Sequence, residues 1–333
     1  MKFIYTADLH FSSYSQDKID PVTYLPERLS GIYTTFCNII NYGLDNKIET
    51  IVIGGDVFHN KSLIHSIAQS RLLDIIRVFK QMKFIVIDGN HDLSSMTGDG
   101  VSALKCLDNE QNVKTIHKTE KIENILCVPW DPRNMFSDIK EGSADYLISH
   151  FGLNEATLSS GISIVSDIGL KDVKHFKHCF LGHYHDGQTV GNVTYVGNPT
   201  QLDWNDKNQE KRFLVIDSNS GNTQSIPTFG YKKHCEFNIT AQNKDEVMKQ
   251  VFTLKAEGHH IKLNKTDDLD LSEIENDYNV IDKREKNITN RGITSEMSVT
   301  DKLNRFLEIK EIPVEKREIY KNIALDIMES IVI

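Results

Sequence analysis

The sequence predicts an α/β protein: a two-sheet αββα sandwich with helices on its outer faces, followed by a small C-terminal α/β cap and a helical tail. Apolar runs of strand length alternate with amphipathic helical stretches as far as Asn112, shorter strands follow, and the character changes again near Tyr231. The chain has 333 residues and a mass of 38.0 kDa, which allows one large domain with an appendage, or two domains.

Three strands and two helices are predicted in the first part of the chain. The strands are Lys2 to Ala7, Thr50 to Ile53 and Phe84 to Ile87. Two sets of apolar residues at helical spacing predict the helices: Leu25, Leu29, Ile32, Phe36 and Ile40, then Ile64, Ile67, Leu72, Ile75, Ile76, Phe79 and Met82. Strands separated by helices of this length indicate βαβ units around a mostly parallel sheet.

Shorter strands are predicted after Asn112. They are Ile122 to Val128, Tyr146 to Ser149, Cys179 to Gly182, Val193 to Val196 and Phe213 to Asp217. Turn signals such as Gly191-Asn192 lie between them, so we expect a second, more antiparallel and meandering sheet.

The remainder of the chain predicts two further parts. We expect a large α/β domain over 1–228, a small cap over 229–296 with a strand at Cys235 to Ile239 and a helix at Lys244 to Ala256, and a helical segment over 297–333. An acidic run in the cap is typical of a solvated loop or helix face. Its members are Asp267, Asp268, Asp270, Glu273, Glu275 and Asp277.

Composition and charge exclude several classes of protein. Nothing in the sequence indicates bulk disorder, collagen or a coiled coil, and the apolar runs are too short to span a membrane. With 38 basic and 47 acidic residues the formal net charge is −9, which argues against a non-specific DNA coat but not against a metal-dependent nuclease. The five cysteines are scattered and form no CxxC pair, as expected of reduced thiols in a cytoplasmic protein.

Polar residues follow the apolar strands at the points where the strands end. The set, in chain order, is Asp8-Leu9-His10, Gly55-Asp56, Gly89-Asn90-His91-Asp92, Ser149-His150 and Gly182-His183-Tyr184-His185. Each piece alone is a weak signal. Because an α/β sheet binds its ligands at the carboxyl ends of its strands, the ordered set predicts one functional site.

The chemistry of this set is that of a metal centre. It supplies aspartate, histidine and one amide oxygen but no cysteine, which suits two divalent ions such as Mn, Fe, Zn or Mg rather than a thiolate zinc site. A carboxylate that bridges two metals about 3.5–4 Å apart builds a hydrolytic centre, and phosphoester hydrolysis is the reaction it favours.

These motifs, in this order, resemble those of the calcineurin-like metallophosphoesterases over roughly residues 1 to 218. The resemblance implies one metal on Asp8, His10, Asp56 and His185. It implies a second metal on the bridging Asp56 with Asn90, His150 and His183. His91 becomes the catalytic acid, and Asp92 becomes the carboxylate that orients it.

A finer resemblance is to the SbcD-type nucleases, the repair and recombination subunits that pair with an SMC-like ATPase. Gly55-Asp56-Val57-Phe58-His59 is similar to their motif, in which the extra histidine, here His59, assists exonuclease catalysis. Tyr195-Val196-Gly197-Asn198-Pro199 is similar to their later loop, and short phage-encoded members have about this length.

This resemblance implies a Mn-dependent nuclease that acts on DNA ends in repair, recombination or replication. It implies 3′–5′ exonuclease and single-strand endonuclease activity, a homodimer, and C-terminal helices that dock on the ATPase. The expected location is the cytoplasm, or the host cytoplasm for a phage-encoded chain, with no membrane partner.

Two other functions fit the motifs. A phosphatase or cyclic-nucleotide phosphodiesterase of the same fold has the same ligands, and a binding scaffold would show degenerate ligand positions, which this chain does not. The tail also allows two interpretations, because the stripe of Ile319, Ile323, Ile327 and Ile331 either packs on its own domain or stays exposed for a partner helix. The face of the first helix around Tyr33 and Phe36 is either a dimer contact or core.

Overall fold

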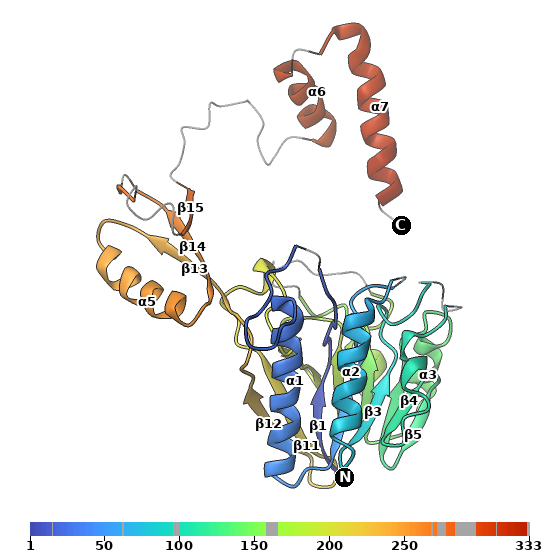
Figure 1. Cartoon of the computed structure of the whole chain (residues 1–333). Coiled ribbons are helices and arrows are strands. Elements are labelled where there is room, and N and C mark those ends of the chain that lie inside the picture. Colours follow the sequence, from blue (N-terminus) through green and yellow to red (C-terminus); the bar gives the residue numbers. More distant parts are fainter. Residues whose placement is uncertain are drawn as a thin grey trace. The chain divides into compact units, whose positions relative to one another are not determined.

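The computed structural model in Figure 1 divides the chain into two compact units. One comprises Met1–Glu236 with Lys249–Lys262, and the other Phe237–Met248 with Leu263–Ile333. The structure describes residues 1–14, 16–61, 63–95, 97, 100–157, 166–267, 269–271, 278–283, 298–310 and 312–331.

The larger unit contains two six-stranded sheets. The first has the order β12-β11-β1-β2-β3-β4 and the second the order β5-β6-β7-β8-β10-β9. The strands of the first sheet are β1 (Lys2–Thr6), β2 (Thr50–Ile53), β3 (Lys83–Ile87), β4 (Val113–Ile116), β11 (Arg212–Asp217) and β12 (Asn222–Pro227). Those of the second are β5 (Glu120–Ile122), β6 (Ile125–Val128), β7 (Tyr146–His150), β8 (His178–Gly182), β9 (Gln188–Val190) and β10 (Val193–Tyr195).

Helices lie on the outer faces of the sheets. The long helices α1 (Glu27–Asp45) and α2 (Ser66–Val78) lie side by side over the first sheet, as Figure 1 shows. The short helices α3 (Met135–Glu141) and α4 (Leu170–Val173) cover the second sheet through their buried residues Ile139 and Val173. Two 3-10 turns, Ala103–Leu107 and Trp204–Asp206, complete the unit.

Three apolar cores separate the four layers. One lies between the first sheet and its helices, one between the two sheets, and one between the second sheet and its helices. Alternate residues of β1 divide between two of these cores, because Ile4 faces the helices while Phe3 and Tyr5 face the second sheet. The predicted αββα sandwich is therefore confirmed.

The second sheet differs from the expected antiparallel meander. Its central strands β6, β7, β8 and β10 are parallel neighbours, and only β5 and β9 at the edges pair antiparallel. The connection through α3 carries the chain back between β6 and β7, which is what a parallel pair requires. The expected strand Ile122 to Val128 is split by a turn in which Glu123 has φ 52°.

The strand expected at Phe213 to Asp217 belongs to the first sheet rather than to the second. As β11 it pairs antiparallel with β1, with Lys2 opposite Asp217. The face of α1 considered for a dimer contact belongs to the core, because Phe36 is fully buried and Tyr33 packs against the same cluster.

In the rest of the chain, the described residues form a small sheet and three helices. The sheet has the order β13-β14-β15, from β13 (His234–Ile239), β14 (His260–Lys265) and β15 (Asn279–Asp282), and α5 (Lys244–Ala256) connects its first two strands. Helices α6 (Val299–Ile309) and α7 (Val314–Ile331) contact each other. Ser298 caps α6, because its hydroxyl accepts a hydrogen bond from the Asp301 amide at 3.1 Å.

Several expectations for this region concern residues outside the described ranges. Asp268, Glu273, Glu275 and Asp277 of the acidic run are among them, and so are the side chains of Ile327 and Ile331. Ile319 and Ile323 are exposed, at 59% and 49%. The division at residues 228 and 296 stays a prediction. None of the helices in the described ranges combines the length and apolarity that a bilayer-spanning segment needs.

Candidate metal centre

The polar residues at the strand ends meet where the two sheets lie against each other. β1, β2 and β3 run parallel in the first sheet, and β7 and β8 run parallel in the second. The loops after β1 and β2 are joined, because the amides of Asp8 and His10 donate to the carbonyls of Gly55 and Asp56 at 3.0 Å. Of the ten predicted site residues, hydrogen bonds and ring contacts link nine to one another, and Asp92 accepts hydrogen bonds from backbone amides of the loops that carry them. The ten residues are Asp8, His10, Asp56, His59, Asn90, His91, Asp92, His150, His183 and His185.

Four of these residues have a left-handed backbone that side chains rarely adopt. The φ angles are 54° at Asp8, 51° at His10, 52° at Asp56 and 93° at His183. Each such residue costs on the order of 1–3 kcal/mol and persists only where its surroundings hold it. The chain therefore turns sharply after β1, β2 and β8 and aims their side chains inward. Gly55 permits the close approach, since a Cβ there would lie 2.5 Å from Nδ1 of His150.

Among the described residues, three groups of side chains could each hold a metal ion, because the possible ligand atoms within each group lie within 4.8 Å of one another. They are Asp8, His10 and His185; His10, Asp56 and His91; and Asp8, Asp56 and His150. Asp56 belongs to two of them, since its Oδ2 lies 3.9 Å from Nε2 of His10 and 3.2 Å from Nε2 of His150. It therefore lies where a carboxylate can serve two cations at once.

At each end of this cluster, further nitrogen and oxygen atoms that could bind a metal lie about 3 Å apart. Nε2 of His10 and Nε2 of His185 are 2.9 Å apart. At the other end the Asn90 amide oxygen lies 3.1 Å from Nε2 of His150 and 3.0 Å from Nδ1 of His183. We call Asp8, His10, Asp56, Asn90, His150, His183 and His185 the candidate metal centre.

Backbone groups fix the orientation of these side chains. Nδ1 of His150 donates to the Gly54 carbonyl at 2.8 Å, which leaves Nε2 as the nitrogen that faces the centre. The amide of His183 donates to both carboxylate oxygens of Asp8, at 3.1 and 3.0 Å, and the amide of His91 donates to Oδ1 of Asp56 at 2.8 Å. Such support is typical of metal ligands, whose orientation depends on their outer partners.

Burial sets the protonation of the imidazoles. It lowers the pKa of His10 well below its usual value and lowers the pKa of His183 to about 3, so both are neutral donors at pH 7. Burial also opposes the charge of His150, but the adjacent Asp56 carboxylate outweighs it and raises the pKa of His150 to about 9. A cation would compete with that proton, as metals do at imidazole ligands.

The donor set fits divalent metal ions. Asp8 and Asp56 are 0% and 2% exposed, and among the described residues no lysine or arginine forms an ion pair with either. Buried carboxylates without a paired cation are costly, and mixed oxygen and imidazole donors are what Mn, Fe, Zn and Mg accept.

His91 and His59 lie together beside the centre. Their rings stack at a centroid distance of 5.7 Å, and Nδ1 of His59 is 3.3 Å from Nδ1 of His10. Nδ1 of His91 donates to the His59 carbonyl at 2.5 Å, so its Nε2 remains available for other contacts. Burial and the neighbouring His91 lower the pKa of His59.

The hydrogen bonds of Asp92 differ from the predicted ones. We expected its carboxylate to orient His91, but it accepts hydrogen bonds from the amides of Val57 (3.3 Å), Phe58 (3.0 Å) and Gly89 (2.9 Å). The His59 carbonyl orients the His91 ring instead. Because these amides belong to the loops after β2 and β3, Asp92 holds together the two loops that carry Asp56 and Asn90.

A buried lysine that the sequence analysis did not single out supports the centre. Lys211 is 3% exposed, and its Nζ donates to the His185 carbonyl at 3.0 Å, to Oδ1 of Asn198 at 2.5 Å and to Oδ1 of Asp206 at 3.0 Å. It therefore ties the segment that follows β10 to the backbone of a metal-centre histidine. His185 and Asn198 lie in motifs, but nothing near Lys211 in the sequence marks it as buried.

Comparison with protein families identifies the class. Residues 1–244 match the calcineurin-like phosphoesterase family, which is well over half of the chain. The chain belongs to this family. It is thus a metallophosphoesterase, and the clusters of aspartate and histidine described above are those of a binuclear centre.

Individual relatives are more distant. The chain is 26% identical over 222 residues to a protein of Enterobacteria phage T4 described as "Exonuclease subunit 1", and the match covers 62% of this chain and 65% of that protein. Two solved structures are similar in part. An archaeal phosphodiesterase has a TM-score of 0.32 at 14% identity, covering 68% of this chain and 99% of that one. Nuclease MPE of Pseudomonas putida has a TM-score of 0.30 at 12% identity, covering 67% and 87%.

Proposed function

We propose that this metallophosphoesterase is a DNA nuclease that hydrolyses phosphodiester bonds at duplex ends with two Mn²⁺ ions. One observation carries the proposal: a second histidine, His59, stacks on His91 beside the candidate metal centre and contacts His10. The distant likeness to the phage T4 protein described as an exonuclease subunit supports the same substrate.

We assign the ligands as follows. Asp8, His10 and His185 hold one ion, Asn90, His150 and His183 hold the other, and Asp56 bridges the two. The distances within the three donor groups support this division, since Asp56 lies between His10 and His150. When bound, the two ions lower the pKa of a water molecule and neutralise charge on the phosphate oxygens.

The protein side chains supply the proton and the orientation. His91 donates from Nδ1 to a carbonyl, which fixes its ring, and in its imidazolium form it can deliver the second proton, on Nε2, to the leaving oxygen. The stacked His59 restricts the same ring from one side. General acid catalysis of this kind contributes typically about 10²–10⁴-fold to the rate.

The test is release of labelled nucleotide from a linear duplex with Mn²⁺, with Mg²⁺ and with EDTA, with an aryl phosphodiester assayed in parallel. We expect release from the duplex that requires Mn²⁺ and stops in EDTA. Turnover of the small ester without attack on DNA would overturn the nuclease and leave the phosphatase of the same fold. A labelled 3′ or 5′ end gives the polarity, for which we expect 3′–5′ digestion and cleavage of single strands.

The helical tail is proposed as the contact with an SMC-like ATPase. Phe306, Val314, Ile319, Tyr320 and Ile323 are exposed large side chains on α6 and α7, from 48% to 75%. Deleting residues 300–333 should abolish partner binding and leave nuclease activity intact. Loss of solubility or of the fold in that deletion would instead mean that the tail packs on its own domain. Sedimentation of the full chain tests the proposed homodimer.

A further inference from the structure

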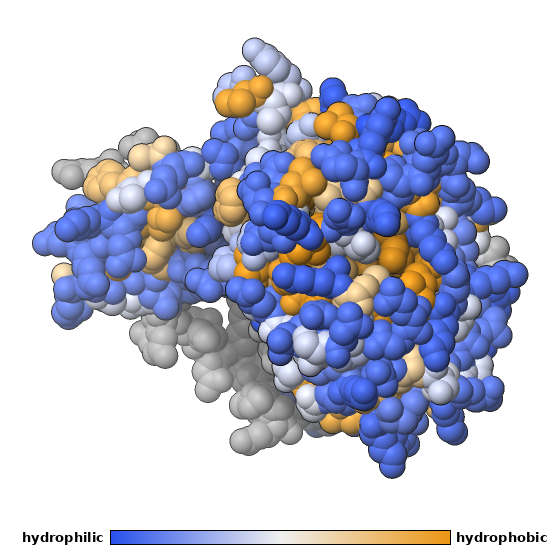
Figure 2. Space-filling model, turned by 90° about the horizontal axis from the view of Figure 1, so that it is seen from below, coloured by the Kyte–Doolittle hydropathy of each residue, from blue (hydrophilic) through white to orange (hydrophobic). Residues whose placement is uncertain are grey.

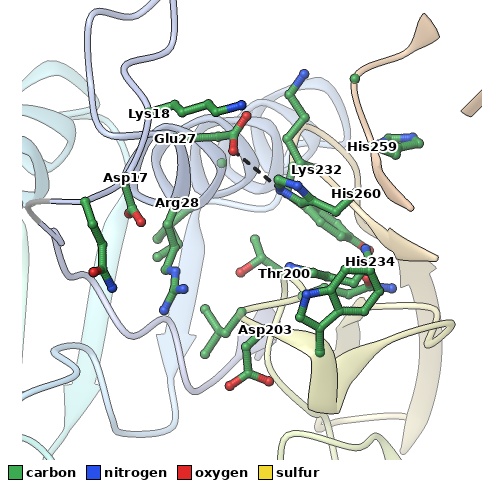
Figure 3. Close-up of a pocket in the computed structure, with 18 of the residues that line it drawn as sticks. Asp17, Lys18, Glu27, Arg28, Thr200, Asp203, Lys232, His234, His259 and His260 are labelled. Carbon is green, nitrogen blue, oxygen red and sulfur yellow. Dashed lines mark hydrogen bonds and ion pairs between the residues drawn. The ribbon is translucent and has the colours of Figure 1, made fainter. Parts of the chain in front are cut away.

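A second cavity of the larger unit lies outside the candidate metal centre. Its volume is about 560 Å³, within the range of pockets that bind small molecules. Its walls come from the segment before α1 and the start of α1, from the 3-10 turn Trp204–Asp206, and from the segments around Tyr231 and His259 (Figure 3). We call it the side pocket.

One wall of the side pocket carries unpaired positive charge. Lys18, Arg28 and Lys232 come from separate segments, and within the described residues none of them forms an ion pair with a carboxylate. Two acidic groups of the wall have other partners. Glu27 lies 3.4 Å from Nε2 of His260, as the dashed line in Figure 3 marks, and Asp203 accepts from the Asn205 amide at 2.7 Å. The lining has four basic side chains, of which Lys255 is the fourth, and three acidic ones, which gives it a formal charge of +1. The pocket can therefore receive an anionic group.

Another part of the wall is built from flat rings. Trp204 and His234 meet edge to face at 5.0 Å, and His234 stacks on His260 at 4.8 Å with an interplanar angle of 25°. Burial lowers the pKa of His234 to about 4, so this ring is neutral at pH 7. Rings of this kind are the surfaces on which nucleobases stack, while cations track the phosphates.

The side pocket also holds an acceptor without a partner. Asp17 lines it, and Oδ2 of Asp17 is buried with no hydrogen bond among the described residues. An unsatisfied buried carboxylate oxygen is costly, and an amino or hydroxyl group of a ligand would satisfy it. Cations, flat rings and one acceptor together match the phosphate, the base and the hydrogen-bond donors of a nucleotide.

Two side chains connect the side pocket to the metal centre. The Arg28 guanidinium lies 4.4 Å from the centroid of the Tyr14 ring, and the Tyr14 ring is 6.0 Å from that of His59. His59 in turn contacts His10. The side pocket therefore lies on the same side of the unit as the metal centre, and a strand whose phosphodiester lies at the centre can reach the pocket with a nearby nucleotide.

We propose that the side pocket binds one nucleotide of the substrate strand, with its base against Trp204 and His234 and its phosphate on Lys18, Arg28 and Lys232. This subsite rests on the proposed nuclease function. Through this subsite the protein would recognise a nearby nucleotide in addition to the scissile phosphate.

The test measures binding rather than cleavage. The probe is a short, fluorescent single-stranded oligonucleotide with phosphorothioate linkages, titrated with the Mn²⁺-loaded full chain over a range of salt concentrations. The variant Lys18→Ala/Lys232→Ala removes two charges from the pocket. The control Lys80→Ala/Lys83→Ala removes two exposed charges from the end of the sheet where β3 begins, far from the strand ends that carry the centre.

We expect Kd to rise about tenfold in the pocket variant and the slope of log K against log salt to fall by about 1.4, which corresponds to two lost phosphate contacts on a single strand. The control should bind as the wild type does. Equal Kd and slope in both variants would overturn the subsite while leaving the nuclease proposal intact. In another outcome, the pocket variant would bind a mononucleotide more weakly than the wild type does while binding the oligonucleotide equally well. The pocket would then serve a free nucleotide, and the proposed subsite would be overturned too.

Failure of the proposed function gives a different result. In that case the wild-type chain itself neither binds the oligonucleotide nor releases nucleotides from the duplex, and both proposals fall together. Thermal unfolding of each variant separates loss of a contact from loss of the fold, and Trp204→Phe, which keeps a flat ring, should retain more affinity than Trp204→Ala.

Discussion

Two clusters of histidine and aspartate lie at the ends of neighbouring parallel strands, and their composition gives them opposite properties. In the candidate metal centre, imidazoles outnumber carboxylates, and burial keeps two of them, His10 and His183, neutral. In the second cluster one imidazole, that of His117 after β4, lies between two carboxylates, 2.7 Å from Asp88 and 3.0 Å from Asp108. The hydrogen bond to Asp88 is the main cause that raises the pKa of His117 to about 9.

The comparison shows what distinguishes a metal site from an internal ion pair. The His117 cluster supplies its own cation, and Ser102 completes it by donating to Oδ1 of Asp88 at 2.5 Å. The candidate metal centre has two buried carboxylates and, among the described residues, no lysine or arginine paired with them. Protonated His150 offsets part of this charge, and cations that enter from outside can balance the rest.

The end of the larger unit opposite the candidate metal centre has a different character. The face seen in Figure 2 lies at the opposite end from the strand ends that carry the centre, and polar and charged side chains cover most of it, with apolar areas between them. The buried polar residues that the sequence predicted for function lie at the other end. Function is therefore concentrated at one edge of the two sheets, as expected for α/β proteins.

The largest predicted effect sharpens the role of the imidazoles. His91→Ala should lower duplex cleavage by about 10²–10⁴-fold, because the leaving oxygen loses its proton donor. Metal content, measured by elemental analysis, should stay near that of the wild type. The control His175→Ala changes an exposed histidine outside the centre and should cleave normally. Loss of bound metal in His91→Ala would make this residue a ligand, as its place in one donor group allows.

The next effect concerns the lysine that supports the centre. Lys211→Met leaves Asp206 buried without its cation and should lower the free energy of unfolding by about 3–5 kcal/mol, measured in urea. Because Lys211 also holds the His185 carbonyl, the folded variant should bind Mn²⁺ about tenfold more weakly.

A second substitution separates these two roles of Lys211. The double variant Lys211→Met/Asp206→Asn removes the uncompensated charge and should recover part of the stability, but not the Mn²⁺ affinity. Full recovery of both would mean that Lys211 balances Asp206 and does not position His185.

The smallest effect tests the other cluster through pH. Because the folded pKa of His117, about 9, lies above the ordinary 6.5, its contribution to stability is fully present below pH 6.5 and is lost as pH rises through about 9. His117→Ala should therefore cost about 1 kcal/mol near pH 6, allowing for the partial exposure of the ring, and less near pH 9.5. A difference in unfolding free energy that does not change with pH would contradict the ion-pair interpretation.

Local patterns in the sequence predicted the layers and the site. Both are built from apolar strands and from the residues that directly follow those strands. Apolar runs that end in Gly-Asp or Gly-Asn-His-Asp place functional residues directly after strands, and β1, β2 and β3 follow that rule. The antiparallel pairing of β11 with β1 was missed because it joins residues more than two hundred positions apart. The parallel core of the second sheet was missed because the helices in the connections between β6, β7 and β8 are short, with seven residues in α3 and four in α4.

The side chains that support the centre could not be predicted either. Asp92 follows His91 in the motif, but its three partners are backbone amides that only the folded loops bring together. Lys211 and Arg28 are ordinary charged residues in the sequence, and only their surroundings make one of them buried and the other part of a pocket.

The proposed reaction requires two metal ions that share Asp56. Calorimetric titration of the metal-free chain with Mn²⁺ tests this, using the wild type and Asp56→Asn, with circular dichroism to establish that the variant is folded. We predict two ions per wild-type chain and weakened binding of both in the variant. One ion per wild-type chain, or unchanged binding in folded Asp56→Asn, would contradict the binuclear centre.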